Sequence, residues 1–298
     1  MSWRTVCINK RAKLEYRMGY MVIRSKDKKR INLDEINVLI IESTAVSLTT
    51  NLLNELSKKK IKVIFCDERH NPYGEIIPYY PHYKSSEEIK KQIDWSENTK
   101  AKLWQLIIID KINKQAQTLE KYNKYDESKL LRQYINEVDE GDETNREGHA
   151  AKVYFNALFG KDFTRHAKNK DRINSLLDYG YSFLLSSFNK EINARGKLTQ
   201  LGIWHDNLFN YFNLSSDLME AFRPLVDQFV IDNELITEEK EENLSSDDKH
   251  VLLKILEEEV MVNGRMYILP NAIKIYVRNM INLLDSNDFN ELPVITYG

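Results

Sequence analysis

The sequence predicts an α+β protein, in which a small N-terminal β domain is followed by a larger all-α domain. Two observations predict this class. Up to about residue 80, short runs such as "YMVIRS" and "KVIFCD" are rich in Val, Ile and Tyr and are separated by polar or glycine turns, as in β-strands. Beyond that point, apolar residues recur at helical spacing. The change of period therefore separates two halves of the chain.

The β domain is assigned to residues 1–80 and is expected to contain one helix, with Ser47 or Thr49 as its N-cap. Residues 81–92 are predicted to form a linker or strap. The stretch around "PYYPHY" is rich in proline and tyrosine, and proline resists both helices and central strands. Residues 93–298 are then the helical domain.

The helical domain is expected to begin with a long helix from Ser96 to about Tyr122. In "MVNGRMYI", the dipeptide Asn263-Gly264 is flanked by apolar residues, which predicts a hairpin with a type I′ turn. Further helices are expected near residues 127–138, 147–159, 174–194, 214–231, 248–260 and 270–284.

Composition excludes several classes of protein. The net charge of −2 and the pI near 6.4 argue against a uniformly basic nucleic-acid-binding surface, although local basic patches stay open. No apolar stretch approaches the length of a transmembrane helix and the N-terminus has no signal-peptide core, so a cytoplasmic protein without a membrane partner is expected. A nucleotide-using metabolic enzyme is disfavoured, because the sequence has no glycine-rich phosphate loop or dinucleotide fingerprint.

Glu147 stands at the start of the apolar helical pattern in "NREGHAAKVYFNALFG". At helical spacing it aligns with Ala150, Ala151 and Tyr154, and a carboxylate on that buried face costs stability unless a positive charge compensates it. A first-turn glutamate favoured by the helix dipole is the simpler interpretation. His149 lies about 200° further round the helix, so we expect a surface or packing histidine there.

A second group of polar residues lies in "LGIWHDNLFNYFNLSSDLMEAFRPLVD". His205 has an apolar context, and Asp217 and Glu220 are spaced to share one helix face. Each feature has an ordinary interpretation, as a core histidine or as a surface pair of Glu220 with Arg223. Together with Glu147 they form a mixed nitrogen and oxygen donor set, which suits Mg²⁺ or Mn²⁺ better than structural zinc. Spacing alone does not show that these residues meet.

These motifs resemble the CRISPR-associated spacer integrases of the Cas1 family, most closely the type II form. The resemblance covers nearly the whole chain, because "MSWRTV", "VIFCD", "NREGHAAKVYFNALFG", "LDYGYSFLLSSF" and "SDLMEAFRPLVD" follow one another in the family's order. It implies a β-sandwich as the N-terminal domain and a helical catalytic domain after it. It also implies a metal-dependent DNA endonuclease and integrase that inserts short DNA fragments, the spacers, into a CRISPR array in antiviral defence.

The resemblance further implies the site residues and the cofactor. Glu147, His205 and Glu220 match the family's catalytic metal ligands, with Mg²⁺ or Mn²⁺ as the ion. Residues expected to support the ligands are Asp217, which matches a second acidic position, Arg223 and Arg146.

The partners implied by the resemblance are DNA and other proteins of CRISPR adaptation. An asymmetric homodimer is expected, and two such dimers would flank a dimer of the small Cas2 protein in a heterohexamer. The complex would bind double-stranded DNA both as the incoming fragment, the prespacer, and as the leader–repeat target. Other adaptation proteins of type II systems are further partner candidates.

Positive charge for DNA phosphates is expected just beyond the Glu147 helix, in "KDFTRHAKNKDR", although a charge run is more often a solvated face. The tyrosine-rich stretch "PYYPHY" offers rings that stack on bases or wedge a duplex fork. The candidate DNA-binding residues are Lys161, Arg165, Lys168, Lys170, Arg172, Tyr79, His82 and Tyr83.

The reaction implied is a transesterification, in which a DNA 3′-OH attacks a phosphodiester at one end of the repeat and then at the other. Because His205 should act as a neutral ligand, activity is expected to fall below about pH 6.5. Two other classes stay open. One is a metal-dependent nuclease that uses water to cut branched DNA. The other is a non-catalytic DNA-binding scaffold, in which the carboxylates serve only as ion pairs.

Overall fold

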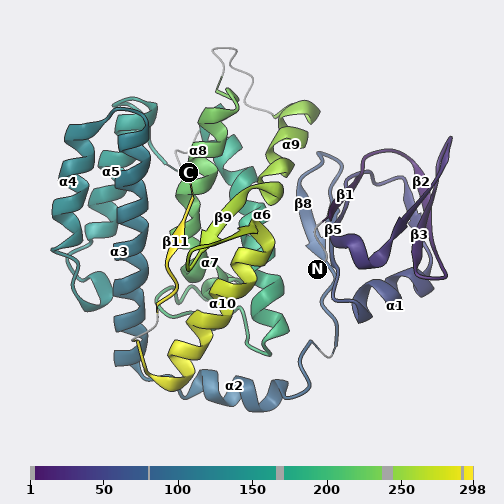
Figure 1. Cartoon of the computed structure of the whole chain (residues 1–298), viewed down its shortest axis with the longest axis horizontal. Helices are drawn as coiled ribbons and strands as arrows, with labels where there is room; N and C mark the ends of the chain where they lie inside the picture. Colours follow the sequence, from purple (N-terminus) through teal and green to yellow (C-terminus); the bar gives the residue numbers. More distant parts are fainter. Residues whose placement is uncertain (1–3, 80, 166–170, 237–243, 290–291, 298) are drawn as a thin grey trace. The chain divides into compact units, whose positions relative to one another are not determined.

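The structure is a computed structural model that describes residues 4–79, 81–165, 171–236, 244–289 and 292–297 (Figure 1). The chain forms two compact units. The first consists of residues 1–81 with the short segments 256–258 and 268–270, and the second holds the remaining residues.

The first unit contains two four-stranded sheets that share one apolar core. One sheet has the order β1 (Arg4–Ile8), β5 (Ile36–Ile41), β7 (Lys62–Cys66) and β8 (Pro72–Glu75). The other has the order β4 (Lys28–Asn32), β3 (Tyr20–Arg24), β2 (Ala12–Arg17) and β6 (Val46–Leu48). Strands β1, β5 and β7 are parallel, and β5 is buried along its whole length, as expected where both faces of a sheet are covered.

Residues 4–79 also form two helical elements. They are the 3₁₀ turn η1 (Leu33–Glu35) and α1 (Thr50–Lys58). Thr49 rather than Ser47 is the N-cap of α1, because its hydroxyl accepts a hydrogen bond from the Leu52 backbone N–H at 3.3 Å. Leu52 is fully buried in the core that the two sheets share, so the one predicted helix is confirmed.

The remainder of the chain is mainly helical. Its helices are α2 (Ser85–Ile93), α3 (Glu97–Lys121), α4 (Tyr125–Ile135), α5 (Arg146–Phe159), α6 (Arg172–Ala194), α7 (Asn213–Met219), α8 (Arg223–Asp232), α9 (Ser246–Leu253) and α10 (Leu269–Ser286). The 3₁₀ turns are η2 (Glu140–Asp142), η3 (Glu220–Phe222) and η4 (Lys254–Glu257), and the strands are β9 (Glu259–Val262), β10 (Arg265–Ile268) and β11 (Ile295–Thr296). Within the described residues, no helix combines the length and apolar character needed to cross a membrane.

The predicted linker over residues 81–92 is wrong in most of its length, since α2 begins at Ser85. The prolines lie upstream of this helix and do not interrupt it. Its charges also suit a helix, because Glu87 and Glu88 lie in the first turn and lysines lie in the last turn, each at the favourable end of the dipole.

Helix α3 is the long predicted helix, and Ser96 is its N-cap as expected. It packs against α4, α5, α8 and η3. Most of its buried residues are apolar, among them Trp104 and Ile108, but Lys111 and Lys114 are buried as well. A buried lysine requires a paired negative charge, so α3 brings positive charge into the interior.

The helix predicted over 214–231 is broken. Helix α7 ends at Met219, η3 follows, and α8 starts at Arg223 with Pro224 in its first turn. Proline has no N–H and its ring clashes with the carbonyl four residues earlier, here that of Glu220, so the α-helical hydrogen bond to this carbonyl is missing. The Arg223 N–H instead bonds the Glu220 carbonyl in a 3₁₀ turn.

Two other predictions concern the C-terminal part. The helix expected over 248–260 ends early, because η4 and then β9 replace its second half. The predicted hairpin is confirmed, since β9 pairs with β10 and Asn263 and Gly264 have φ values of 50° and 77°, as a type I′ turn requires. Strand β11 pairs antiparallel with the other edge of β9.

Gly180 of α6 packs closely against Val226 of α8. A Cβ at this position would lie 2.4 Å from Cγ1 of Val226. At an interior helix position, alanine is normally more favourable than glycine by about 1 kcal/mol. We nevertheless expect Gly180→Ala to lower the free energy of unfolding by about 1–3 kcal/mol, because the added methyl overpacks the core. Urea denaturation of Gly180→Ala, Val226→Ala and the double variant tests this, and purely additive effects would contradict the steric account.

Candidate active site

A pocket of about 530 Å³ in the helical unit is lined by six of the candidate residues, which are Glu147, Lys161, Arg165, His205, Glu220 and Arg223. Its walls come from α3, α5, α6, η3 and α8, and from the loops after α5 and α6. The ionisable side chains that line it are Lys111, Glu147, Lys152, Lys161, Arg165, Tyr181, His205, Glu220, Arg223 and Asp227. The pocket therefore brings together Glu147, His205 and Glu220 from separate parts of the chain.

Glu147 is placed by the way α5 begins. Asn145 adopts a left-handed conformation and caps the helix, accepting a hydrogen bond from the Gly148 N–H at 3.2 Å. The Asp142 carboxylate accepts from the N–H groups of Arg146 and Glu147 at 2.8 and 2.9 Å. Asn145 and Asp142 thus fix the first turn of α5, and the Glu147 side chain on this turn lines the pocket.

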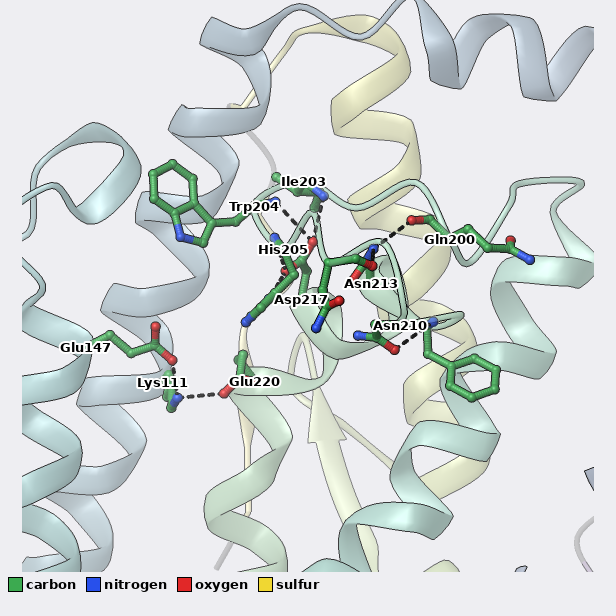
Figure 2. A network of polar contacts seen from close by, with 12 residues as sticks. Lys111, Glu147, Gln200, Ile203, Trp204, His205, Asn210, Asn213, Asp217 and Glu220 are labelled. Atoms are coloured by element: carbon green, nitrogen blue, oxygen red, sulfur yellow. Dashed lines mark hydrogen bonds and ion pairs between the residues drawn. The ribbon is translucent and has the colours of Figure 1, made fainter. Parts of the chain in front are cut away.

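The Lys111 ammonium lies between Glu147 and Glu220 (Figure 2). Its Nζ is 2.6 Å from Oε1 of Glu147 and 2.6 Å from Oε2 of Glu220. The second Glu220 oxygen accepts from Nε of Arg223 at 2.8 Å. The Glu220 side chain is only 5% exposed, and burial alone would raise its pKa, but the charges of Arg223 and Lys111 lower that pKa to about 2. Glu220 is therefore an anion in the folded protein.

His205 is held by Asp217. The ring Nδ1 lies 2.5 Å from Oδ1 of Asp217, which is fully buried and also accepts from the backbone N–H groups of Ile203, Trp204 and His205. Because Asp217 accepts at Nδ1, the Nε2 atom is left to face the pocket, and the ring extends toward Glu220 (Figure 2). The hydrogen bond to Asp217 raises the pKa of His205 above its usual 6.5, although burial opposes this.

The side chains present fit a divalent cation. Lys111 shows that a positive charge is stabilised between the two carboxylates, where a metal ion would also be stabilised. The carboxylate of Asp217 behind the His205 ring is the arrangement that orients metal-binding histidines. Carboxylate oxygens with one imidazole nitrogen suit Mg²⁺ or Mn²⁺. Glu147, Glu220 and His205 are thus the residues that could hold the ion.

The residues predicted to support the ligands divide into two groups. Asp217 and Arg223 contact His205 and Glu220 directly. Arg146 does not line the pocket, since its guanidinium pairs with Glu137 at 3.0 Å and lies over the ring of Tyr134.

His149 is exposed beside Tyr134, as predicted.

The predicted DNA-binding residues lie in different places. Lys161 and Arg165 line the pocket, and Arg165 also bonds Asp178 and Asn174. Arg172 instead joins α6 to α9 through Asp248 at 2.8 Å. Tyr79 and Tyr83 are exposed, and the ring of His82 contacts that of Tyr83. Lys168 and Lys170 lie outside the described residues.

Sequence reasoning misses Lys111, Asp142 and a buried group around Asp227. The Asp227 carboxylate accepts from the hydroxyls of Tyr154 and Tyr181 at 2.9 and 2.5 Å. Burial raises the pKa of Asp227 to about 6, although both hydrogen bonds act in the opposite direction. The Tyr181 ring in turn lies under the guanidinium groups of Arg165 and Arg223. Lys161, Arg165 and Arg223 form one cationic wall of the pocket, and this buried group supports the two arginines.

The fold and the pocket together define a two-unit α+β protein with a carboxylate–histidine site suited to a divalent cation and lined by cationic side chains. Residues 6–263 match the model of the family described as CRISPR associated protein Cas1, and the chain therefore belongs to this family. The family predicted from the sequence motifs is confirmed.

Two curated relatives show the extent of the similarity. The CRISPR-associated endonuclease Cas1 of Neisseria meningitidis serogroup C is 35% identical over 232 residues, which cover 78% of this chain and 76% of that protein. A Cas1 endonuclease of Francisella tularensis subsp. novicida is 29% identical over 233 residues, covering 72% of this chain and 73% of its own length.

Solved structures share the fold. A Cas1 protein from Thermotoga maritima superposes with a TM-score of 0.76 at 19% identity, covering 94% of this chain and 97% of that one. A casposase bound to an integration product gives 0.75 at 19% identity, covering 98% and 92%. A Cas6-RT-Cas1–Cas2 complex gives 0.72 at 18% identity, and there the match covers 96% of this chain and 35% of the longer chain. The predicted α+β fold class is confirmed.

Proposed function

We propose that this chain is a metal-dependent DNA integrase that inserts short DNA fragments into a CRISPR array by 3′-OH attack on phosphodiesters of the repeat. The observation that carries the proposal is the meeting of Glu147, Glu220 and the Asp217-held His205 in one pocket with a cationic wall. Membership of the Cas1 family supports it, as do relatives named CRISPR-associated endonucleases. The fold shared with a casposase bound to an integration product agrees with it.

Glu147, Glu220 and His205 would hold Mg²⁺ or Mn²⁺ through carboxylate oxygens and the imidazole Nε2. When bound, the ion would supply positive charge to the scissile phosphate and lower the pKa of the attacking hydroxyl. The chain's own groups prepare this arrangement. Asp217 keeps the proton of the His205 ring on Nδ1, so that Nε2 presents a lone pair.

The cationic wall would bind DNA and hold one of the metal ligands. Lys161 and Arg165 would contact DNA phosphates at the pocket, while Arg223 keeps Glu220 ionised and in place. Attack by a DNA hydroxyl needs no water nucleophile, so the orientation of the two DNA strands matters more than a strong general base. Arg165 is fixed by Asp178 and the Tyr181 ring, which gives that contact a defined position.

The proposed assembly contains an asymmetric homodimer, a Cas2 dimer and double-stranded DNA, as prespacer and as leader–repeat target, in the cytoplasm. A Cas6-RT-Cas1–Cas2 complex with the same fold supports a Cas2 partner. The DNA roles of Tyr79, His82 and Tyr83 belong to the proposal too, and the exposure of the two tyrosines agrees with them. The assignment of this chain to the type II form of the family is part of the proposal as well.

Two alternatives each have an observation in their favour. The relatives are named endonucleases, which favours a nuclease that uses water at the same site. The Lys111 bridge satisfies both carboxylates without a metal, which favours a non-catalytic DNA-binding scaffold.

Replacement of the proposed histidine ligand should abolish strand transfer. A labelled duplex with free 3′-OH ends is mixed with Cas2, Mn²⁺ and a plasmid carrying leader and repeat. We expect His205→Ala to reduce joined label by at least about 100-fold, because even the loss of a group behind a metal ligand costs about 10- to 100-fold. His149→Ala is the matched control and should join normally. Equal joining by both variants would contradict the site, whereas cutting without joining would favour the nuclease.

Strand transfer should also have an acid limit set by His205. Protonated imidazole cannot bind a metal, and Asp217 raises the pKa of His205 above 6.5, so the proton is lost only above that pH. We therefore expect joining at a limiting Mn²⁺ concentration to fall as the pH decreases, and Asp217→Asn to move the midpoint of this fall to lower pH. A wild-type profile that stays flat down to about pH 5 is incompatible with a histidine ligand.

A further inference from the structure

Lys111 occupies the oxygen atoms that the proposed function assigns to a metal ion. The inference drawn from this rests on that proposed function. Its Nζ is 2.6 Å from both Oε1 of Glu147 and Oε2 of Glu220 (Figure 2). A metal ion that binds these two oxygens cannot share them with an ammonium group at hydrogen-bonding distance.

The charges around Glu220 are already balanced without a metal. Glu147 and Glu220 contribute two negative charges, and Lys111 and Arg223 contribute two positive charges at contact distance. The Lys111 and Glu220 side chains are 9% and 5% exposed, so these charges are poorly screened by water. A divalent cation added to this set would leave two uncompensated positive charges in a buried place.

We propose that Lys111 is an internal counter-cation that exchanges with the metal ion. Without metal it neutralises the two carboxylates and keeps them close together. When a divalent cation binds, Lys111 leaves these oxygens and turns toward the negative phosphates of bound DNA. The exchange lowers the affinity for metal in the free protein and makes metal binding tighter when DNA is present.

The lysine side chain suits such an exchange. Its charge is compact and its four-carbon stem is flexible, whereas an arginine would hold both carboxylates in a rigid planar fork. The helix that carries it does not need to move, because neighbours such as Ile107, Ile108 and Ile112 are fully buried in the core. Only the side chain has to change conformation, and it already lines the pocket.

A permanent ion pair would behave in the opposite way. If Lys111 only held the ligands in position, its removal would let the two carboxylates repel each other and would weaken metal binding. If it competes with the metal, its removal strengthens metal binding. The sign of the change in affinity therefore separates the two roles.

The test is Mn²⁺ affinity by isothermal titration calorimetry, without DNA, for the wild type, Lys111→Met and Lys111→Gln. We expect both variants to bind Mn²⁺ at least about tenfold more tightly, which corresponds to about 1.4 kcal/mol. Both should melt at lower temperature in a chelator and be stabilised by Mn²⁺ more than the wild type is. Lys114→Met is the matched control, because Lys114 is a buried lysine of α3 that pairs with Asp110 outside the pocket. Its Mn²⁺ affinity should be unchanged.

A second arm uses the wild type alone. Mn²⁺ should bind more tightly when a duplex with a free 3′-OH end is present, and equal affinity with and without DNA overturns the exchange. Unchanged or weaker binding in both Lys111 variants overturns it as well. Failure of the proposed function would look different. The wild type would then either not bind Mn²⁺ or bind it as tightly as His205→Ala does.

Discussion

The helical unit depends on a buried positive charge. Lys111 of α3 contacts Glu147 at the start of α5 and Glu220 in η3, so one ammonium group joins three elements that are distant in sequence. A buried lysine is tolerated only with paired negative charge, and buried carboxylates need a cation. The packing of α3 against α5 and η3 therefore satisfies both requirements at the same point.

The break between α7 and α8 makes this contact possible. Pro224 removes the α-helical hydrogen bond to the Glu220 carbonyl, and the 3₁₀ turn that begins at Glu220 follows directly after Asp217, Leu218 and Met219. Asp217 thus bonds the loop that carries His205, while Glu220 reaches Lys111. One short segment consequently holds the histidine and supplies a carboxylate to the same pocket.

Much of the fold follows from the sequence, because local signals act over a few residues. The change of period near residue 80, Ser96 as a cap and the Asn263-Gly264 turn are examples. The prediction of a linker fails because the prolines act only upstream of Ser85, while the charge pattern beyond it favours a helix. The residue types alone suggest that Glu147, His205 and Glu220 form one donor set, but they lie on different elements, so spacing cannot show that they share a pocket. Lys111 does have a sequence signal, because a lysine four residues after Ile107 on an apolar helix face indicates a buried charge with a partner, but the pattern does not say which carboxylates pair with it.

The measurement that tests the account most directly is anomalous diffraction from crystals of the protein grown with Mn²⁺ and a DNA duplex end. The account predicts an anomalous peak contacted by Glu147, Glu220 and Nε2 of His205, with the Lys111 ammonium moved away from both carboxylates. A pocket without such a peak, in which Lys111 still bridges Glu147 and Glu220 in the presence of Mn²⁺ and DNA, would contradict it.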